Sequence, residues 1–309
     1  MSEQIGVKQR RGLFGRRGMA GGTGPEAPSP PAGKTAAARR PVNLWLGGGL
    51  VALVLLAAGL SLLWTPHPHA VLAVSNKFAA PSASHWLGTD QLGRDVVSQL
   101  MVAARNSMTV ALVAVLLGGS IGTVLGLAAS AFGGWVETLV MRFADLSFAF
   151  PALLFAIMLA AAFGPSLSNA VLAIAFINIP IFARVARGAA NVVWTRDYVL
   201  AGRAAGFGAV RLTRDHILPN IAAPLIVQAT IEFAVAILAE AALSYLGLGA
   251  QPPMPSWGRM LSEAQTLMYL APQLAVYPGL CIVAAVLGFG LLGDGLRDVT
   301  DPRLVRART

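Results

Sequence analysis

Residues 103–132 read AARNSMTVALVAVLLGGSIGTVLGLAASAF, an apolar run in which Arg105 is the one charged residue. The hydrocarbon core of a bilayer is about 30 Å thick, and an α-helix of roughly 20 apolar residues crosses it. Helix is the expected conformation because lipid offers the backbone no hydrogen-bond partner, and because the run lacks the alternation of polar and apolar residues found in membrane barrel strands. The run therefore predicts a transmembrane helix.

The composition of the whole chain agrees with this prediction. Of 309 residues, 56% are hydrophobic and 12% are charged, and the mean hydropathy is +0.66, unlike a soluble globular domain. We expect an all-α polytopic membrane protein with six transmembrane helices, kinked at Pro151 and Pro180. The six spans are Leu44–Trp64, Ala103–Phe132, Leu146–Phe163, Ala170–Val185, Ile221–Leu246 and Ala275–Leu292.

The spans divide the chain into five parts. The N-terminal part is rich in Gly, Pro, Ala and basic residues and has no apolar periodicity, which predicts disorder. Asp95 is placed to cap a helix that leads into the second span. The predicted parts are 1–43, a disordered basic cytoplasmic tail; 44–64, the first transmembrane helix; 65–102, an extracytoplasmic segment with an interfacial helix; 103–296, a five-helix transmembrane core with a long connecting loop at 196–220; and 297–309, a cytoplasmic tail.

The positions of Lys and Arg predict the orientation of these parts. Of 23 such residues, all but Lys77, Arg94, Arg105 and Arg259 fall on the side that carries both termini when the chain has six spans. Basic residues are enriched in cytoplasmic loops, so both termini are predicted to be cytoplasmic. The net charge of +9 then reflects topology and contact with membrane lipid, and we expect no nucleic-acid partner.

The connection between the fourth and fifth spans contains residues 198–220, YVLAGRAAGFGAVRLTRDHILPN. This stretch is helix-forming and basic, and it is broken by Gly206 and Gly208, which can adopt the positive φ that a sharp turn requires. Pro219 lies where the fifth helix begins, a position at which the missing amide does no harm. A surface that docks a soluble partner fits this pattern, and so does a basic amphipathic helix lying on lipid.

The same stretch resembles the coupling loop of ATP-binding-cassette importer permeases, which reads Glu-Ala-Ala, three residues, Gly, nine residues, then Ile-x-Leu-Pro. Gly206, Leu218 and Pro219 match in identity and spacing, whereas Leu200 replaces the Glu and His216 takes the Ile position. The resemblance implies that a set of residues couples the chain to an ATPase: Tyr198, Ala201, Arg203, Ala204, Gly206, Phe207, Gly208, Arg211, Ile217, Leu218 and Pro219.

Three further segments are similar to one branch of these permeases, the second permease subunit of dipeptide, oligopeptide, glutathione and nickel importers. The segments are Leu87–Asp95 (LGTDQLGRD), Leu243–Gly258 and Leu291–Arg303. Without the resemblance, the segment at 243–258 is expected to leave the membrane with Trp257 as an interface anchor. The segment at 291–303 is expected to end the sixth helix at Gly293 and Gly295.

The resemblance implies a type I importer permease that forms half of the pathway for di- or oligopeptides, with glutathione or nickel as alternative substrates. It implies a sister permease subunit, two cytoplasmic ATPase subunits and an extracytoplasmic substrate-binding protein as partners. ATP and Mg would be bound by the ATPases, and no cofactor by this chain. A secondary transporter or channel that works without ATPases is the alternative of a different class.

The chain itself is not expected to be an enzyme. Residues Pro28–Thr35 imitate the end of a phosphate-binding loop, but Pro28 replaces the first Gly, and we expect neither a strand before the segment nor a helix after it. His67 and His69 flank a Pro after the first span, where two histidines are more often solvated than bound to metal. We therefore expect no catalytic residue and no metal site.

Charged residues inside the spans are the remaining candidates. Glu232 and Glu240 lie in the fifth span, and carboxylates in membrane helices usually face a bundle interior or a watery cavity. Both are therefore candidates for the substrate pathway, although Glu240 can instead hydrogen-bond to a neighbouring helix. Asp145 is expected to pair with Arg142, three residues earlier on the same helix.

Overall fold

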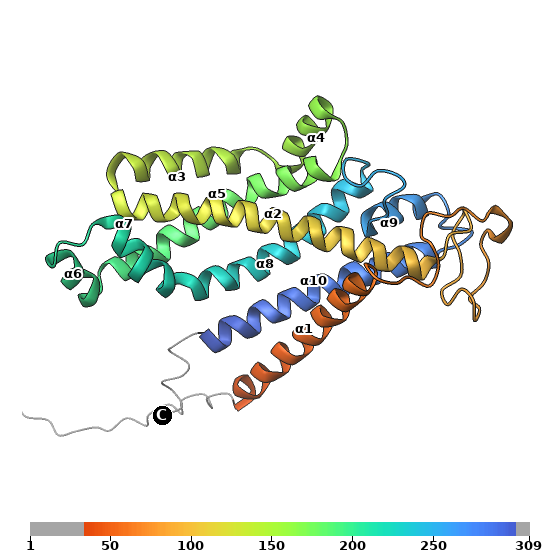
Figure 1. Cartoon of the computed structure of the whole chain (residues 1–309), viewed down its shortest axis with the longest axis horizontal. Coiled ribbons are helices and arrows are strands. Elements are labelled where there is room, and N and C mark those ends of the chain that lie inside the picture. The colour runs from red at the N-terminus through yellow and green to blue at the C-terminus, as the bar shows by residue number, and fades with distance from the viewer. Residues whose placement is uncertain (1–33, 301–309) are drawn as a thin grey trace, which may run out of the picture. The chain divides into compact units, whose positions relative to one another are not determined.

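The computed structural model describes residues 34–300 (Figure 1), so most of both predicted tails lies outside the described residues. From residue 34 to residue 300 the chain forms helices and no β-strand, which confirms the predicted all-α class. The contacts given below lie within one compact unit that begins at Ala38. The helices are α1 (Lys34–Leu60), α2 (Val96–Phe132), α3 (Gly134–Ala149), α4 (Ala152–Phe163), α5 (Leu167–Trp194), α6 (Asp197–Ala204), α7 (Ala209–Leu212), α8 (Leu218–Tyr245), α9 (Trp257–Gln265) and α10 (Gln273–Thr300), with short turns η1 (Val74–Asn76) and η2 (Thr213–Ile217).

Within the described residues, five helices are long and apolar enough to cross a membrane, and a bent pair raises the number to six if it counts as one span. The pair is α3 and α4, which meet at an angle of 83°. The bend lies at Phe150 and Pro151, where Phe150 is extended and Pro151 cannot continue the helical hydrogen bonds. The kink predicted at Pro151 is therefore confirmed, whereas Pro180 lies inside the uninterrupted helix α5.

Helices α2 and α5 pack closely along their length, as Figure 1 shows. Three glycines of α2, at intervals of one helical turn, face the backbone of α5: Gly118, Gly122 and Gly126. A Cβ atom added at these positions would lie 2.4, 2.3 and 2.3 Å from carbonyl oxygens of α5. Small residues at this spacing allow two membrane helices to approach until their backbones touch.

Helix α3 is joined to α5 by two ion pairs. Asp145 pairs with Arg184 across the helices at 2.6 Å, so the prediction of a pair with Arg142 is wrong. Glu137 pairs with Arg187 in the same way. Helix α5 continues to Trp194 instead of ending near residue 185, which brings Arg187 as well as Arg184 inside the helix and opposite the carboxylates of α3.

Helix α10 differs from its prediction at its end. It runs through Gly293 and Gly295 to Thr300, so the prediction that these glycines end the helix is wrong. A Cβ at Gly293 would lie 2.6 Å from the hydroxyl of Thr230 in α8, and one at Gly295 would lie 3.0 Å from Leu44 in α1. Both glycines are close-packing positions between helices.

The first two helices begin earlier than predicted. Helix α1 starts at Lys34, so residues 34–43 are helical rather than disordered, and a helix does follow the Gly-Lys-Thr of the loop-like segment. Helix α2 starts at Val96 and continues without a break, so residues 96–102 are its first turns and not a separate interfacial helix. The N-cap prediction is confirmed, because Asp95 accepts a hydrogen bond from the backbone N–H of Ser98.

Candidate functional site

The predicted coupling loop folds into two short helices, α6 and α7, joined at Gly206; we call residues 197–212 the coupling hairpin. The amide of Phe207 donates to the carbonyl of Gly202 at 3.0 Å, and the amide of Gly206 donates to that of Arg203 at 3.0 Å. These two bonds form a Schellman motif, which requires a left-handed residue after the helix end. Gly206 supplies it with a φ of 83°. Gly208 has a φ of −69°, so its predicted need for positive φ is wrong.

The coupling hairpin is fixed to the bundle by its own small core. Val199, Leu212 and Ile217 are fully buried. A Cβ on Gly202 would lie 2.8 Å from the side chain of Leu212, so α6 and α7 meet closely at this point. Ile217, which the resemblance implied as a coupling residue, therefore holds the hairpin in place and is not available to a partner.

The outer surface of the coupling hairpin is apolar with a basic edge. Tyr198, Leu200 and Val210 are 46%, 48% and 69% exposed, a high value for apolar residues of a connecting segment. Arg211 lies over the ring of Phe207, with its guanidinium carbon 4.1 Å from the ring centroid. The remaining implied coupling residues are also exposed, five on the hairpin and two at the start of α8: Ala201, Arg203, Ala204, Gly206 and Gly208, and Leu218 and Pro219.

Sequence reasoning missed Leu200 and Val210 as surface residues. Leu200 occupies the position of the family's Glu, in an eight-residue helix that also contains Asp197 and Arg203. The short length of this helix could have indicated that Leu200 is exposed. A helix of about two turns cannot bury every apolar residue, so some of them must face outward. An exposed apolar cluster with a polar rim is the usual composition of a protein interface.

A polar cleft of about 560 Å³ lies between the coupling hairpin and the ends of α2 and α5. Ser130 and Asn191 line it from the helix ends, and Arg203 lines it from the hairpin. The guanidinium of Arg203 also lies 5.7 Å from the ring of Trp194, a cation–π contact that ties α6 to the end of α5. The coupling hairpin therefore contacts the end of α5, while a cleft separates part of it from the helix ends.

The two glutamates of α8 are both buried. Glu240 accepts hydrogen bonds from Ser107 of α2 at 2.6 Å and from Ser244 at 2.7 Å, and it has no exposed surface. Glu232 accepts a bond from Gln228 at 2.8 Å and is also buried. The packing of Glu240 supports the alternative that it joins two helices, and neither side chain lines one of the described cavities.

The opposite end of the bundle, where α2 begins, is organised by the signature Leu87–Asp95. Asp90 accepts hydrogen bonds from the amides of Leu92 and Arg94 and from the side chain of Gln99. Arg94 in turn pairs with Asp90 at 2.6 Å and with Glu263 of α9 at 2.9 Å. The signature therefore builds a turn and attaches it to α9.

The loop before α9 places Trp257 differently from its prediction. Trp257 is only 1% exposed, and its indole N–H donates to the carbonyl of Leu100 in α2 at 3.3 Å. The prediction of an anchor at the membrane interface is wrong for this residue. Trp257 and the turn at Asp90 together fix α9 against the start of α2.

Comparison with known proteins places this fold and this loop in one class. Residues 118–306 match the family described as binding-protein-dependent transport system inner membrane component. The chain belongs to this family, and it is a permease of an ATP-binding-cassette importer.

The relatives specify the branch. The chain is 45% identical over 242 residues to the dipeptide transport system permease protein DppC of Alkalihalophilus pseudofirmus, covering 78% of this chain and 80% of that protein. It is 44% identical over 224 residues to the glutathione transport system permease protein GsiD of Pectobacterium atrosepticum, covering 72% and 74%. The predicted resemblance to the dipeptide and glutathione branch is confirmed.

A solved structure shows the same fold. The methionine ABC transporter MetNI, in inward-facing conformations, matches with a TM-score of 0.52 and 19% identity, covering 68% of this chain and 96% of that chain. The likeness confirms the predicted importer-permease architecture.

Proposed function

We propose that this chain is the permease subunit that forms half of the translocation pathway of a dipeptide importer. The observation that carries the proposal is its 45% identity to a dipeptide permease over most of both chains. Glutathione is the second candidate substrate, because glutathione permeases are 44% identical and glutathione is itself a small peptide.

In this proposal the partners are a sister permease, two ATPases and an extracytoplasmic binding protein. One ATPase docks on the coupling hairpin, and ATP and Mg bind in the ATPases, so this chain catalyses no reaction. ATP is then a ligand that prefers one of two states of the complex and shifts the population toward it. The apolar surface of Tyr198, Leu200 and Val210 supports this role, since nothing else in the described chain covers it.

The connection between the coupling hairpin and the membrane helices supports transmission of movement. From Ala209 to Tyr245 the chain forms one helical run, in which α7, η2 and α8 follow each other directly. Helix α8 packs against α2, α5 and α10. A displacement of the hairpin would therefore move α8 as a rigid rod, and α8 would pass the movement to the helices around it.

We propose that the coupling hairpin faces the cytoplasm of a bacterial inner membrane. It carries the exposed basic residues Arg203 and Arg211, and the exposed Arg214 follows it in η2. At the opposite end, Arg94 and Arg259 are paired with carboxylates, Arg259 with Glu263 at 2.9 Å. When the chain has six spans, all but four of its 23 Lys and Arg residues fall on the side of the coupling hairpin, which agrees with the positive-inside rule.

The substrate proposal is tested by uptake measurements in cells that lack this chain. Uptake of a labelled dipeptide is expected to be lost on deletion and restored by the intact gene, whereas uptake of free amino acids is unchanged. Loss of glutathione uptake with normal dipeptide uptake would instead select the second candidate. Dipeptide uptake that needs this chain but persists without the partner ATPases would favour the ATP-independent transporter.

A further inference from the structure

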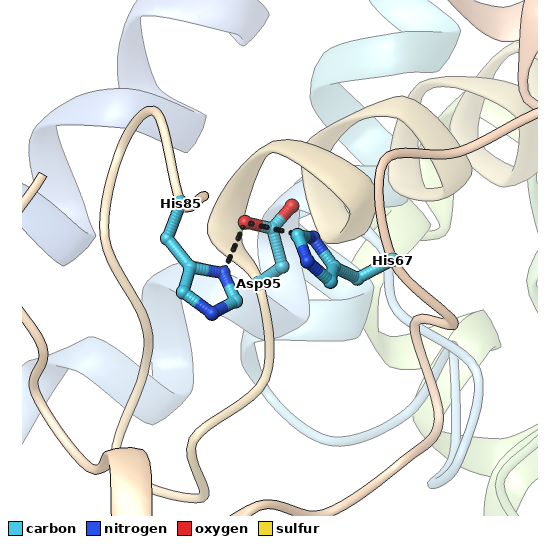
Figure 2. Close-up of side chains that lie close together, drawn as sticks. All are labelled: His67, His85 and Asp95. Atoms are coloured by element: carbon cyan, nitrogen blue, oxygen red, sulfur yellow. Dashed lines mark hydrogen bonds and ion pairs between the residues drawn. The ribbon is translucent and has the colours of Figure 1, made fainter. Parts of the chain in front are cut away.

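Three side chains that are separated in the sequence converge at the end of the bundle opposite the coupling hairpin, as Figure 2 shows. His67 and His85 come from the connection between α1 and α2, residues 61–95, and Asp95 is the N-cap of α2. The Nδ1 atom of His85 lies 3.0 Å from Oδ1 of Asp95, and Nδ1 of His67 lies 3.8 Å from the same oxygen. One ligand atom from each residue falls within 4.8 Å of the other two.

The carboxylate of Asp95 is held in a fixed orientation. Its Oδ2 atom accepts hydrogen bonds from the amide and the hydroxyl of Ser98, both at 2.8 Å, which leaves Oδ1 directed at the two imidazoles. The hydroxyl of Ser98 also accepts a bond from the backbone amide of His67 at 2.9 Å. Although burial opposes ionisation, the hydrogen bonds from His85 and Ser98 lower the pKa of Asp95 below its ordinary value.

The imidazole of His67 has an unsatisfied atom in this cluster. Its Nδ1 is buried and has no hydrogen-bond partner, although the side chain as a whole is 38% exposed. Buried polar atoms without a partner are rare in folded proteins and indicate a missing ligand, ion or water. The rings of His67 and His85 are tilted against each other with centroids 4.4 Å apart, so both can direct a nitrogen to one point near Asp95.

We propose that His67, His85 and Asp95 bind a divalent transition-metal ion of the Zn²⁺ type. Two imidazole nitrogens and a carboxylate oxygen form a three-residue donor set that Zn²⁺ accepts, with water as a fourth ligand. Mg²⁺ and Ca²⁺ are disfavoured, since they prefer oxygen ligands. Zinc bonds of about 2.0–2.2 Å place tetrahedral ligands about 3.4 Å apart, so His85 and Asp95 need little movement and His67 must approach slightly.

The ion would act as a structural tie. It would join two points of the connection between α1 and α2 to the N-cap residue of α2, next to the turn that Asp90 and Arg94 attach to α9. Ser98, which positions both Asp95 and the backbone of His67, would serve as the outer support that metal ligands usually have. His69, which is separated from His67 only by Pro68, does not belong to the cluster.

The proposal is tested on the full-length chain, purified without a histidine tag and stripped with a chelator. Titration with Zn²⁺ is expected to show saturable binding of roughly one equivalent per chain, and Co²⁺ to give a visible absorption band from a site with imidazole ligands. His67→Ala and His85→Ala are each expected to weaken Zn²⁺ binding by roughly tenfold or more. His69→Ala is the matched control and is expected to bind as the wild-type chain does.

A variant that retains the helix cap guards against loss of folding. Asn is as good an N-cap as Asp, so Asp95→Asn preserves the start of α2 and removes the anionic ligand. It is expected to lose the Co²⁺ band and the rise in melting temperature that Zn²⁺ gives the wild-type chain. Binding that is absent from the wild-type chain, or equal in wild type, His67→Ala and Asp95→Asn, would overturn the proposal.

Discussion

Replacing Gly206 by Val is expected to lower ATP-driven transport by roughly five- to thirtyfold while the permease stays folded in the membrane. Gly206 holds a φ of 83° in the Schellman motif that ends α6, and no atom lies within 4 Å of the place a Cβ would take. The loss therefore comes from backbone strain, which costs a β-branched residue about 1–2 kcal/mol in this conformation. The cost falls on a small element and distorts the surface that docks the ATPase.

Two control variants separate strain from other causes. Gly208→Val places the same side chain two residues away, at a φ of −69° and in open space, so it tests bulk without strain. Gly206→Asn retains a residue that adopts left-handed backbone readily. Gly206→Asn is expected to keep co-purification of the ATPases and substrate-stimulated ATP hydrolysis. Gly208→Val, which adds bulk to the docking surface without strain, is expected to reduce both less than Gly206→Val does. Normal transport by Gly206→Val would contradict the role assigned to the turn.

Replacing Glu240 by Leu is expected to destabilise the permease strongly. The carboxylate of Glu240 accepts hydrogen bonds from the hydroxyls of Ser107 in α2 and Ser244. The hydroxyl of Ser244 also accepts a hydrogen bond from the backbone amide of Ala250 at 3.0 Å. Leu has a similar size but no acceptor, and each buried hydroxyl left unpaired costs about 1–3 kcal/mol. Thermal unfolding in detergent is expected to show a lower midpoint and a smaller folded yield.

Glu240→Gln is the matched variant, because the amide oxygen still accepts a hydrogen bond between α8 and α2. If Glu240 joins the helices, this variant is expected to fold and to transport at close to the wild-type rate. If Glu240→Gln is as stable as wild type but does not transport, the negative charge itself is needed. That result would support a role for Glu240 in the substrate pathway.

The sequence predicted the features that depend on local chemistry. Apolar length located five of the spans, whereas the third predicted span, Leu146–Phe163, straddles the bend between α3 and α4. The conformational needs of a helix end correctly identified Gly206 as a residue with positive φ. Asp95 was identified as a cap for the same reason, since short polar side chains accept from the first helical amides. Pro151 bends its span because it lacks an amide.

Features that depend on neighbouring helices could not be predicted in this way. Gly293 was predicted to end its helix because Gly often does so in soluble proteins. In this helical bundle it instead lies where α10 packs closely against Thr230 of α8. Asp145 pairs with Arg184 of another helix, and a pairing rule for one helix cannot find such a partner. The burial of Trp257 likewise depends on how α9 folds back onto α2.

The same distinction between local sequence and contacts with other helices applies to the candidate sites. The spacing of Gly206, Leu218 and Pro219 located the coupling hairpin, but only the fold shows that Ile217 is buried while Leu200 and Val210 are exposed. The cluster at Asp95 was missed because its histidines belong to a connection with little regular structure, and the sequence was interpreted as having no metal site.

The central claim is that the coupling hairpin is the surface on which an ATPase docks, and site-specific photocrosslinking tests it most directly. A photoreactive residue at Val210, which is 69% exposed, is placed in the assembled importer in native membranes. The control position is Val124 in α2, which is 65% exposed along a membrane span. We predict an adduct with the ATPase from position 210 and none from position 124. An adduct with lipid alone at position 210, or equal adducts from both positions, would contradict the account.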